Sequence, residues 1–377
     1  MTAPGRHEAL RSLLGAWALG ACPRHEAAEV ARHLAGCPEC AEEAARLSGA
    51  AAELTPDDPL DLSSALRRQV LDWCLTRRPA RLPIPAWAGP YAAESAKLDA
   101  LMRDLGPAEW QEVAELPWHG GVQRWRPAEV LCHLTAVDGY LARSVGLPDP
   151  LGGARPPLVG RRPPVSRVPE QGGPEQGGPS GVLGRTWALI TAAGGEDPEQ
   201  VRRRWRRQSH DLLQAASVHG GDGGVPVDYG FAVLPLRDAF LDRAFECWIH
   251  GDDIARAVDY PYPPPAPAHL RRLIDLGARI LPQLLAARRR AQPTAAAAVP
   301  GRALRLVIDG PAAGEWLIPL DGAGEGAEPV AEMALDGLEF CYLAAAHRDP
   351  DRIPVGEEGD REAIRQVLHA LPLLSRP

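Results

Sequence analysis

The chain has 377 residues, of which 45% are hydrophobic and 24% are charged, and its formal net charge is −8. These values are ordinary for a folded globular protein, so they exclude a disordered or fibrous chain. The negative charge argues against a direct nucleic-acid partner bound over the whole surface. No apolar run is long enough for a transmembrane helix, and the N-terminus lacks the pattern of a signal peptide. We therefore expect a cytoplasmic protein with no membrane partner.

The sequence contains seven cysteines, an odd number. Without an export signal, cysteines are mostly reduced, and some of them serve as metal ligands. We therefore expect free or metal-bound thiols rather than a framework of disulfides.

Residues 1–50 are predicted to form a small helical domain. The first helix is indicated by the spacing of Leu10, Leu13, Leu14 and Trp17, and a second one is expected from Ala27 to Leu34. Residues 51–90 contain one amphipathic segment, 62–76, and then the proline-rich stretch RRPARLPIPAWAGP. Because prolines break helices and stiffen extended chain, this stretch indicates a linker.

Residues 91–265 show the pattern of a helix bundle. Helices are expected at 91–105, 127–145, 182–193, 198–218 and 236–258. Between the second and third of these, residues 146–180 are of low complexity and contain the tandem repeat EQGGPEQGGP. This composition is typical of a flexible insert.

Residues 266–377 differ in character from the rest. A helix is expected at 269–288, strands at 303–308 and 315–320 with a turn-rich spacer between them, and helices at 336–346 and 360–371. This order predicts a small α+β domain. The fold class of the whole chain is therefore mainly α, with a small helical head, a helix bundle of the four-helix up-down type and a small C-terminal α+β domain.

His33, Cys37 and Cys40 form the first candidate site, in the stretch HLAGCPEC. A gap of two residues allows both thiolates to reach one tetrahedral metal, and sulfur and imidazole ligands favour zinc. A fourth ligand must come from further upstream. We expect His7, because the first helix can pack it beside His33. Cys22 is the alternative, because zinc also binds thiolate well.

This stretch resembles the zinc-binding anti-sigma domain, over residues 5–48. The resemblance is carried by His7, by LLGAWALGA ending at Ala21, by EAAEVARHL at 26–34 and by CPEC at 37–40. The sequence departs from the family at PRHE, where an Asp-Pro turn is usual, and in its extra Cys22. The resemblance implies a transcription regulator that clamps a sigma factor of the extracytoplasmic-function type.

His133, Glu246 and His250 form the second candidate site. Glu246 and His250 lie four residues apart in FECWIHGDDIARA, so one helix face carries both. His133 lies in an earlier helix, and bundle cores commonly build metal sites from facing helices. Two imidazoles and a carboxylate suit zinc with an open position. Asp253 falls on the same helix face as Glu246. Three roles are open for it: a metal ligand, a hydrogen-bond acceptor for a ligating imidazole, or no role in the site.

Residues 91–260 resemble the DinB-like metal-binding domain of mycothiol-dependent maleylpyruvate isomerases. The matching stretches are VLCHLTAVDGYL and AFECWIHGDDIARAV, and the family's zinc ligands carry over to His133, Glu246 and His250. Residues 270–371 resemble the family's C-terminal domain, in which an arginine assists activity. Arg348 is the nearest counterpart, but the usual Gly-Arg is absent. The resemblance implies mycothiol as the thiol.

The other histidines and cysteines lack such spacing. We expect His25, His119, His210, His219, His269, His347 and His369 to be surface or helix-face residues, and Cys74, Cys132, Cys247 and Cys341 to lie on apolar helix faces.

Three functions compete. The first is a regulator, in which an anti-sigma head is fused to a metal-binding bundle that senses a low-molecular-weight thiol or metabolite. The second is an enzyme, a zinc-dependent isomerase or thiol transferase that uses mycothiol, with zinc lowering the pKa of the bound thiol. The third is a protein whose metals only hold small helical units together. We favour the regulator, because an enzyme needs no anti-sigma head.

Overall fold

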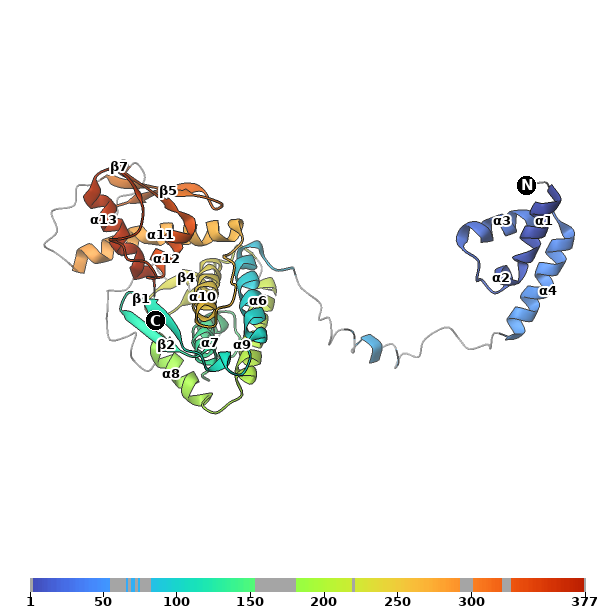
Figure 1. The fold of residues 1–377 in the computed structure, drawn as a ribbon, viewed down its shortest axis with the longest axis horizontal. Coiled ribbons are helices and arrows are strands. Elements are labelled where there is room, and N and C mark those ends of the chain that lie inside the picture. The colour runs from blue at the N-terminus through green and yellow to red at the C-terminus, as the bar shows by residue number, and fades with distance from the viewer. Residues whose placement is uncertain are drawn as a thin grey trace. The chain divides into compact units, whose positions relative to one another are not determined.

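The computed structural model describes residues 3–54, 66, 69–71, 74, 83–152, 181–218, 221–291, 301–320 and 327–375. The chain divides into two compact units, residues 1–81 and residues 82–377 (Figure 1). Most of the expected helix at 62–76 lies outside the described residues. So do residues 77–82 of the proline-rich stretch and residues 153–180 of the expected insert.

The first unit, which we call the head, is built from α1 (Ala3–Ser12), α2 (Leu14–Ala18), α3 (Arg24–Leu34) and α4 (Pro38–Leu54). The sequence predicted a single helix through Leu10 and Trp17. This prediction is wrong at Leu13, where the helix is interrupted. The backbone N–H of Leu13 bonds to the carbonyl of Leu10 at 3.2 Å, which tightens the chain and separates α1 from α2. The buried core of the head is small and consists of Leu10, Leu14, Val30, Cys40 and Ala44.

The second unit contains a ring of helices, α6 (Gly89–Asp104), α7 (Pro127–Ser144), α9 (Pro198–Val218) and α10 (Leu236–Ala257). Helix α10 packs against α6 and α7, and α9 packs against the same two helices (Figure 1). Helix α8 (Val182–Ala192) lies against α7. Prolines at the first positions of α7 and α9 fix where these helices begin, as the sequence indicated.

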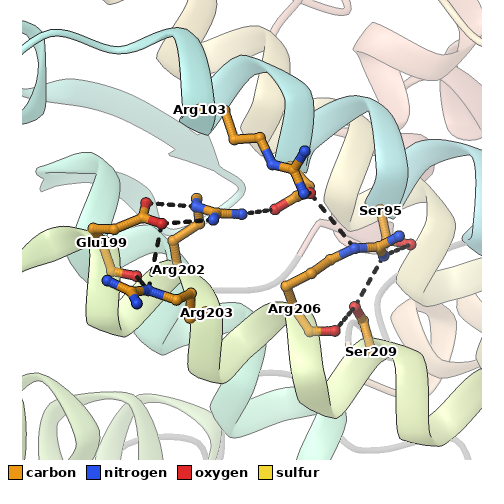
Figure 2. A network of polar contacts seen from close by, with 8 residues as sticks. Ser95, Arg103, Glu199, Arg202, Arg203, Arg206 and Ser209 are labelled. Atoms are coloured by element: carbon orange, nitrogen blue, oxygen red, sulfur yellow. Dashed lines mark hydrogen bonds and ion pairs between the residues drawn. The ribbon is translucent and has the colours of Figure 1, made fainter. Parts of the chain in front are cut away.

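An ion-pair network joins α6 to α9. Arg202 is paired with Glu199 one turn earlier on α9 and with Asp99 on α6, and the side chains of Asp99 and Arg202 are 7% and 9% exposed. Figure 2 shows how Arg206, further along α9, reaches Ser95 and Ser209. Arg202 and Arg206 thus link α9 to α6, and the buried charges of Arg202 and Asp99 are tolerated because they are paired.

Two short hairpins accompany the bundle, and the sequence did not predict them. Strands β1 (Ala114–Trp118) and β2 (Gly121–Trp125) pair in antiparallel register, as do β3 (Pro226–Asp228) and β4 (Val233–Pro235). Single turns of 3-10 helix, η1 (Ala86–Ala88) and η2 (Glu109–Gln111), precede α6 and β1. Strand β1 packs against α10.

The C-terminal part is a mixed sheet with helices. In chain order it contains α11 (Pro267–Ala291), β5 (Arg302–Asp309), β6 (Gly314–Pro319), β7 (Glu328–Asp336), α12 (Gly337–Ala344), β8 (Gly356–Gly359), α13 (Arg361–Ala370) and η3 (Leu371–Leu374). The strand order is β6-β5-β7-β8; β5 and β7 are parallel, and the other pairs are antiparallel. The expected hairpin of β5 and β6 is present, whereas β7 and β8 were not expected.

One continuous cluster of buried apolar side chains runs from Ala88 to Leu371 and includes both the bundle and the C-terminal sheet. The mainly α fold class with a small α+β part is confirmed. The boundary at residue 265 between the bundle and the α+β part stays a prediction. Within the described residues, no helix has the length and apolar character needed to cross a membrane.

Candidate metal centres

The head brings four candidate ligands together. His7 lies on α1, His33 in the last turn of α3, and Cys37 and Cys40 at the start of α4. One donor atom from each residue lies within 4.8 Å of all the others. Gly36 and Pro38 turn the chain between α3 and α4, so the loop returns both thiols toward the imidazoles.

The contacts in this cluster fit a thiophilic metal. Nδ1 of His7 lies 3.9 Å from Sγ of Cys37 and 4.0 Å from Sγ of Cys40. Nε2 of His33 is buried and has no hydrogen-bond partner among the described residues, which is costly unless a ligand uses its lone pair. Burial raises the pKa of the Cys40 thiol, and zinc would reverse this effect because it binds the thiolate.

Cys22, the alternative fourth ligand, lies elsewhere in the head. Its thiol points to the carbonyl of Leu13, with Sγ 3.9 Å from the oxygen, and it is not part of the cluster. The geometry therefore favours His7 as the fourth ligand.

The second cluster lies in the core of the bundle. His133 comes from α7, and Glu246 and His250 come from successive turns of α10. Their donor atoms lie within 4.8 Å of one another, and the two imidazole rings meet edge to face with centroids 5.2 Å apart. Oε2 of Glu246 is 3.7 Å from Nε2 of His133 and 2.9 Å from Nε2 of His250. The side chains of His133, His250 and Glu246 are 2%, 10% and 16% exposed.

A hydrogen bond from α8 fixes the tautomer of His133. The Thr186 hydroxyl donates its proton to the carbonyl of Val182 at 2.9 Å, so it must accept from Nδ1 of His133, which is 3.1 Å away. Nε2 of the neutral ring then presents its lone pair toward the carboxylate of Glu246. The imidazole lone pair and the carboxylate would repel each other without a cation between them. The site therefore fits a metal.

The electrostatics of the second cluster separate its two histidines. Burial lowers the pKa of His133 to about 4, so this ring is neutral near pH 7. Burial alone would also lower the pKa of His250, but the carboxylates of Asp253 and Glu246 raise it to about 9. The pKa of Glu246 is well below its ordinary value, because the contact with His250 and the charges of His250 and Arg243 outweigh the effect of burial.

Asp253 lies beside the cluster and links it to the C-terminal part. Its Oδ2 is 3.4 Å from Nδ1 of His250, and its Oδ1 is 2.6 Å from Nε2 of His347. Nδ1 of His347 lies 2.8 Å from the carbonyl oxygen of Ala345. Both nitrogens of this ring therefore lie within hydrogen-bond distance of an oxygen. Asp253 occupies the position of an acceptor for a ligating imidazole.

The turn that carries His347 has an unusual backbone. The N–H groups of Ala346 and His347 bond to the carbonyls of Leu343 and Tyr342, at 3.0 and 2.8 Å, which ends α12 in a Schellman turn. Ala346 occupies the left-handed position of this turn with φ 60°, where glycine is usual. A residue with a Cβ costs about 1–2 kcal/mol in this conformation.

A buried arginine lies on the other side of Glu246. Nε of Arg243 donates to Oδ1 of Asp138 at 2.9 Å, and the hydroxyl of Tyr91 donates to Oδ2 of the same carboxylate at 2.7 Å. Nη1 of Arg243 is 4.0 Å from Oε2 of Glu246. This fixed positive charge keeps Glu246 ionised, which a metal ligand requires.

Glycine at position 251 allows the side chain of Tyr262 to approach α10 closely. A Cβ atom there would collide with the hydroxyl end of the Tyr262 side chain, which lies against the helix backbone directly after His250. Glycine inside a helix costs about 1 kcal/mol relative to alanine, so this position exchanges helix stability for tight packing.

A small hollow of about 40 Å³ lies beside Glu246. It lies between α10, α11 and α12, and its lining is mostly apolar; Phe245, Leu276 and Phe340 contribute to it together with Glu246. It is far smaller than the roughly 300–1,000 Å³ that binding sites for small molecules commonly have.

Arg348, the candidate catalytic residue, is held away from these ligands. Its guanidinium makes two hydrogen bonds to Glu339, at 2.7 and 2.9 Å, and lies over the ring of Tyr342. The contacts that the structure gives for Arg348 include none with the three ligands of the second cluster.

Sequence reasoning missed three residues of the second site. The expectation that His347 is a surface or helix-face residue is wrong, since its side chain is 3% exposed and pairs with Asp253. Thr186 and His347 give no signal in the sequence, because 53 and 94 residues separate them from their partners. Arg243 was detectable, because it precedes Glu246 by three positions on the same helix face.

Residues 8–41 match the model of a family described as a putative zinc finger. The matched range contains His33, Cys37 and Cys40 and begins directly after His7. This match confirms the resemblance of the head to a zinc-binding domain.

Two solved structures of mycothiol-dependent maleylpyruvate isomerase, one of them of a variant, are similar to this chain. The variant is 14% identical and the other 16% identical, and each comparison has a TM-score of 0.39 and covers 74% of this chain and 95% of the other. No curated protein matches the sequence. We base the functional proposal on the geometry of the two clusters.

Proposed function

We propose that the protein is a zinc-binding, anti-sigma-like transcription regulator whose second unit holds another metal and binds a low-molecular-weight thiol. The observation that carries the proposal is the convergence of His7, His33, Cys37 and Cys40 in a unit with so small a core. Five buried residues cannot stabilise such a unit alone, so a metal supplies the missing free energy.

The partner of the head is a sigma factor of the extracytoplasmic-function type. This part of the proposal is supported by the resemblance of residues 5–48 and by exposed apolar side chains that follow α4 in the head. Val70 and Leu71 are 49% and 50% exposed. Exposed apolar side chains on a helical segment are suited to a groove on a partner protein.

The test is capture of the partner by the tagged full-length chain from native cell extract, with identification by mass spectrometry. We expect a sigma factor to co-purify, and we expect its loss when residues 60–78 are deleted or when Cys37→Ser and Cys40→Ser are combined. Cys22→Ser is the matched control, because it removes a thiol of the same unit outside the cluster. Absence of any sigma factor from the wild-type capture would refute the partner.

The second unit binds its metal through His133, Glu246 and His250. Three protein donors leave a coordination position for an added ligand, which a sensor or a catalyst needs and a closed structural site does not. A bound zinc would supply Lewis acidity and stabilise a thiolate. The chain's own residues orient the donors: Thr186 fixes His133, and Asp253 faces His250.

An alternative function is that of a zinc-dependent isomerase or transferase that uses mycothiol. The three-donor cluster of His133, Glu246 and His250 is the observation that favours it, because three protein donors leave a position for a reacting thiol. The test is turnover of maleylpyruvate with mycothiol by the zinc-loaded chain. Turnover that His250→Ala abolishes would favour the enzyme. Thiol binding without turnover would favour the sensor.

A further inference from the structure

We propose that His347 is a positioning residue of the second metal centre, which fixes Asp253 and through it His250. The inference rests on the proposed metal centre. It links the turn after α12 to metal binding in the bundle, although this turn supplies no ligand.

The carboxylate of Asp253 is shared unequally between two imidazoles. Its contact with Nε2 of His347 is 2.6 Å, whereas its contact with Nδ1 of His250 is 3.4 Å. Both carboxylate oxygens are used, one for each ring. The shorter bond is the stronger constraint, so His347 decides where the carboxylate lies when it faces His250.

His347 is itself held firmly. Its Nδ1 contacts the carbonyl of Ala345, its backbone N–H closes the turn onto Tyr342, and its ring lies near the ring of Tyr342 with centroids 6.2 Å apart. The next residue, Arg348, is anchored to Glu339. The position of the His347 ring is therefore set by its own contacts. The Asp253 carboxylate takes the orientation that its bond to this ring requires.

The charge balance supports the same role. The side chains of Asp253 and His347 are each 3% exposed, and a carboxylate buried so deeply requires a charged or strongly donating partner. If the imidazole of His347 were removed, the carboxylate would keep one long contact and would turn away from His250. Groups that orient a ligating histidine typically change metal affinity by about 10–100-fold when they are removed.

The experiment measures cobalt affinity of the full-length chain by competition with a chromophoric chelator. Cys37→Ser and Cys40→Ser are present throughout, so that the head does not contribute. We expect His347→Phe, which keeps an aromatic ring without N–H groups, to weaken cobalt binding by about 10–100-fold. His347→Gln restores one donor and should recover part of the loss.

His369→Phe is the matched control, because His369 pairs at 3.2 Å with the exposed Asp351 in the same C-terminal part. It should leave the affinity unchanged. A second readout is the cobalt absorption spectrum, which reports ligand geometry and should change in His347→Phe but not in His369→Phe. Hydrogen exchange of residues 345–348 should slow when cobalt binds to the wild type and should not respond in His347→Phe.

If His347→Phe does not fold, Asp253→Asn examines the same link from the other partner and should weaken cobalt binding to a similar extent. Where both variants fold, their effects should not add, because they remove one shared contact. An affinity within twofold of the wild type and an unchanged spectrum in His347→Phe would overturn the role of His347. A wild-type chain that binds no cobalt would instead overturn the metal centre, and this role with it.

Discussion

Metal binding at the second centre should become about tenfold tighter for each pH unit between pH 7 and 9, because the metal must displace one proton. In the metal-free protein the pKa of His250 is raised to about 9, so this ring is protonated at neutral pH. The pKa of His133 is about 4, so His133 does not compete. At pH 7 the proton on His250 costs about 2.7 kcal/mol, or about 100-fold in affinity.

The same shift has a consequence for stability. A histidine whose folded pKa is raised contributes stability that is fully present below its unfolded pKa, about 6.5, and is lost as the pH rises through the folded pKa. For His250 this contribution is about 3 kcal/mol, and it disappears through pH 9. The metal-free second unit should therefore weaken at alkaline pH, whereas the metal-loaded unit should not.

The assay is competition with a chelator of known pH dependence, on the full chain with Cys37→Ser and Cys40→Ser. Asp253→Asn is informative here, because it removes a carboxylate that raises the pKa of His250. In that variant the affinity should level off at a lower pH than in the parent chain. An affinity that does not vary between pH 7 and 9 would refute the reasoning, since no proton would then be displaced.

Three further predictions concern other parts of the chain. Cys37→Ser combined with Cys40→Ser should abolish zinc in the head and unfold it, because structural zinc contributes on the order of 10 kcal/mol to such units; metal analysis and circular dichroism will check this. Ala346→Gly should raise the free energy of unfolding by about 1 kcal/mol, measured by denaturant titration, because glycine tolerates the left-handed turn. Asp99→Ala should lower the same quantity by about 1.5–3 kcal/mol, because Arg202 would lose a buried charged partner but would keep Glu199.

Local patterns were sufficient to predict much of the fold and the ligands. Pro127 and Pro198 begin helices where their fixed φ predicts, and the spacing of Glu246 and His250 places both on one face of α10. The head cluster is equally local, since three of its four donors lie within residues 33–40. In each case the constraint acts over one or two helical turns, which is the range that a sequence pattern describes.

Elements that depend on distant partners were not predictable. Strand β7 was missed because its residues, EPVAEMALD, lack a strong alternating pattern, and its pairing with β5 and β8 stabilises it. The break at Leu13 was missed because the apolar spacing continues through it. The contact of His347 with Asp253 arises only when the C-terminal part packs on the bundle, so no spacing within the sequence indicates it.

Gly251 also limits how the second centre can be transferred to another scaffold. A designer who copies Glu246 and His250 onto an idealised helix would replace this glycine with alanine to gain helix stability. That change would push Tyr262 and the segment around it off the helix directly beside a ligand. A working graft must therefore carry the glycine and its tyrosine together, or enclose the site with a smaller side chain.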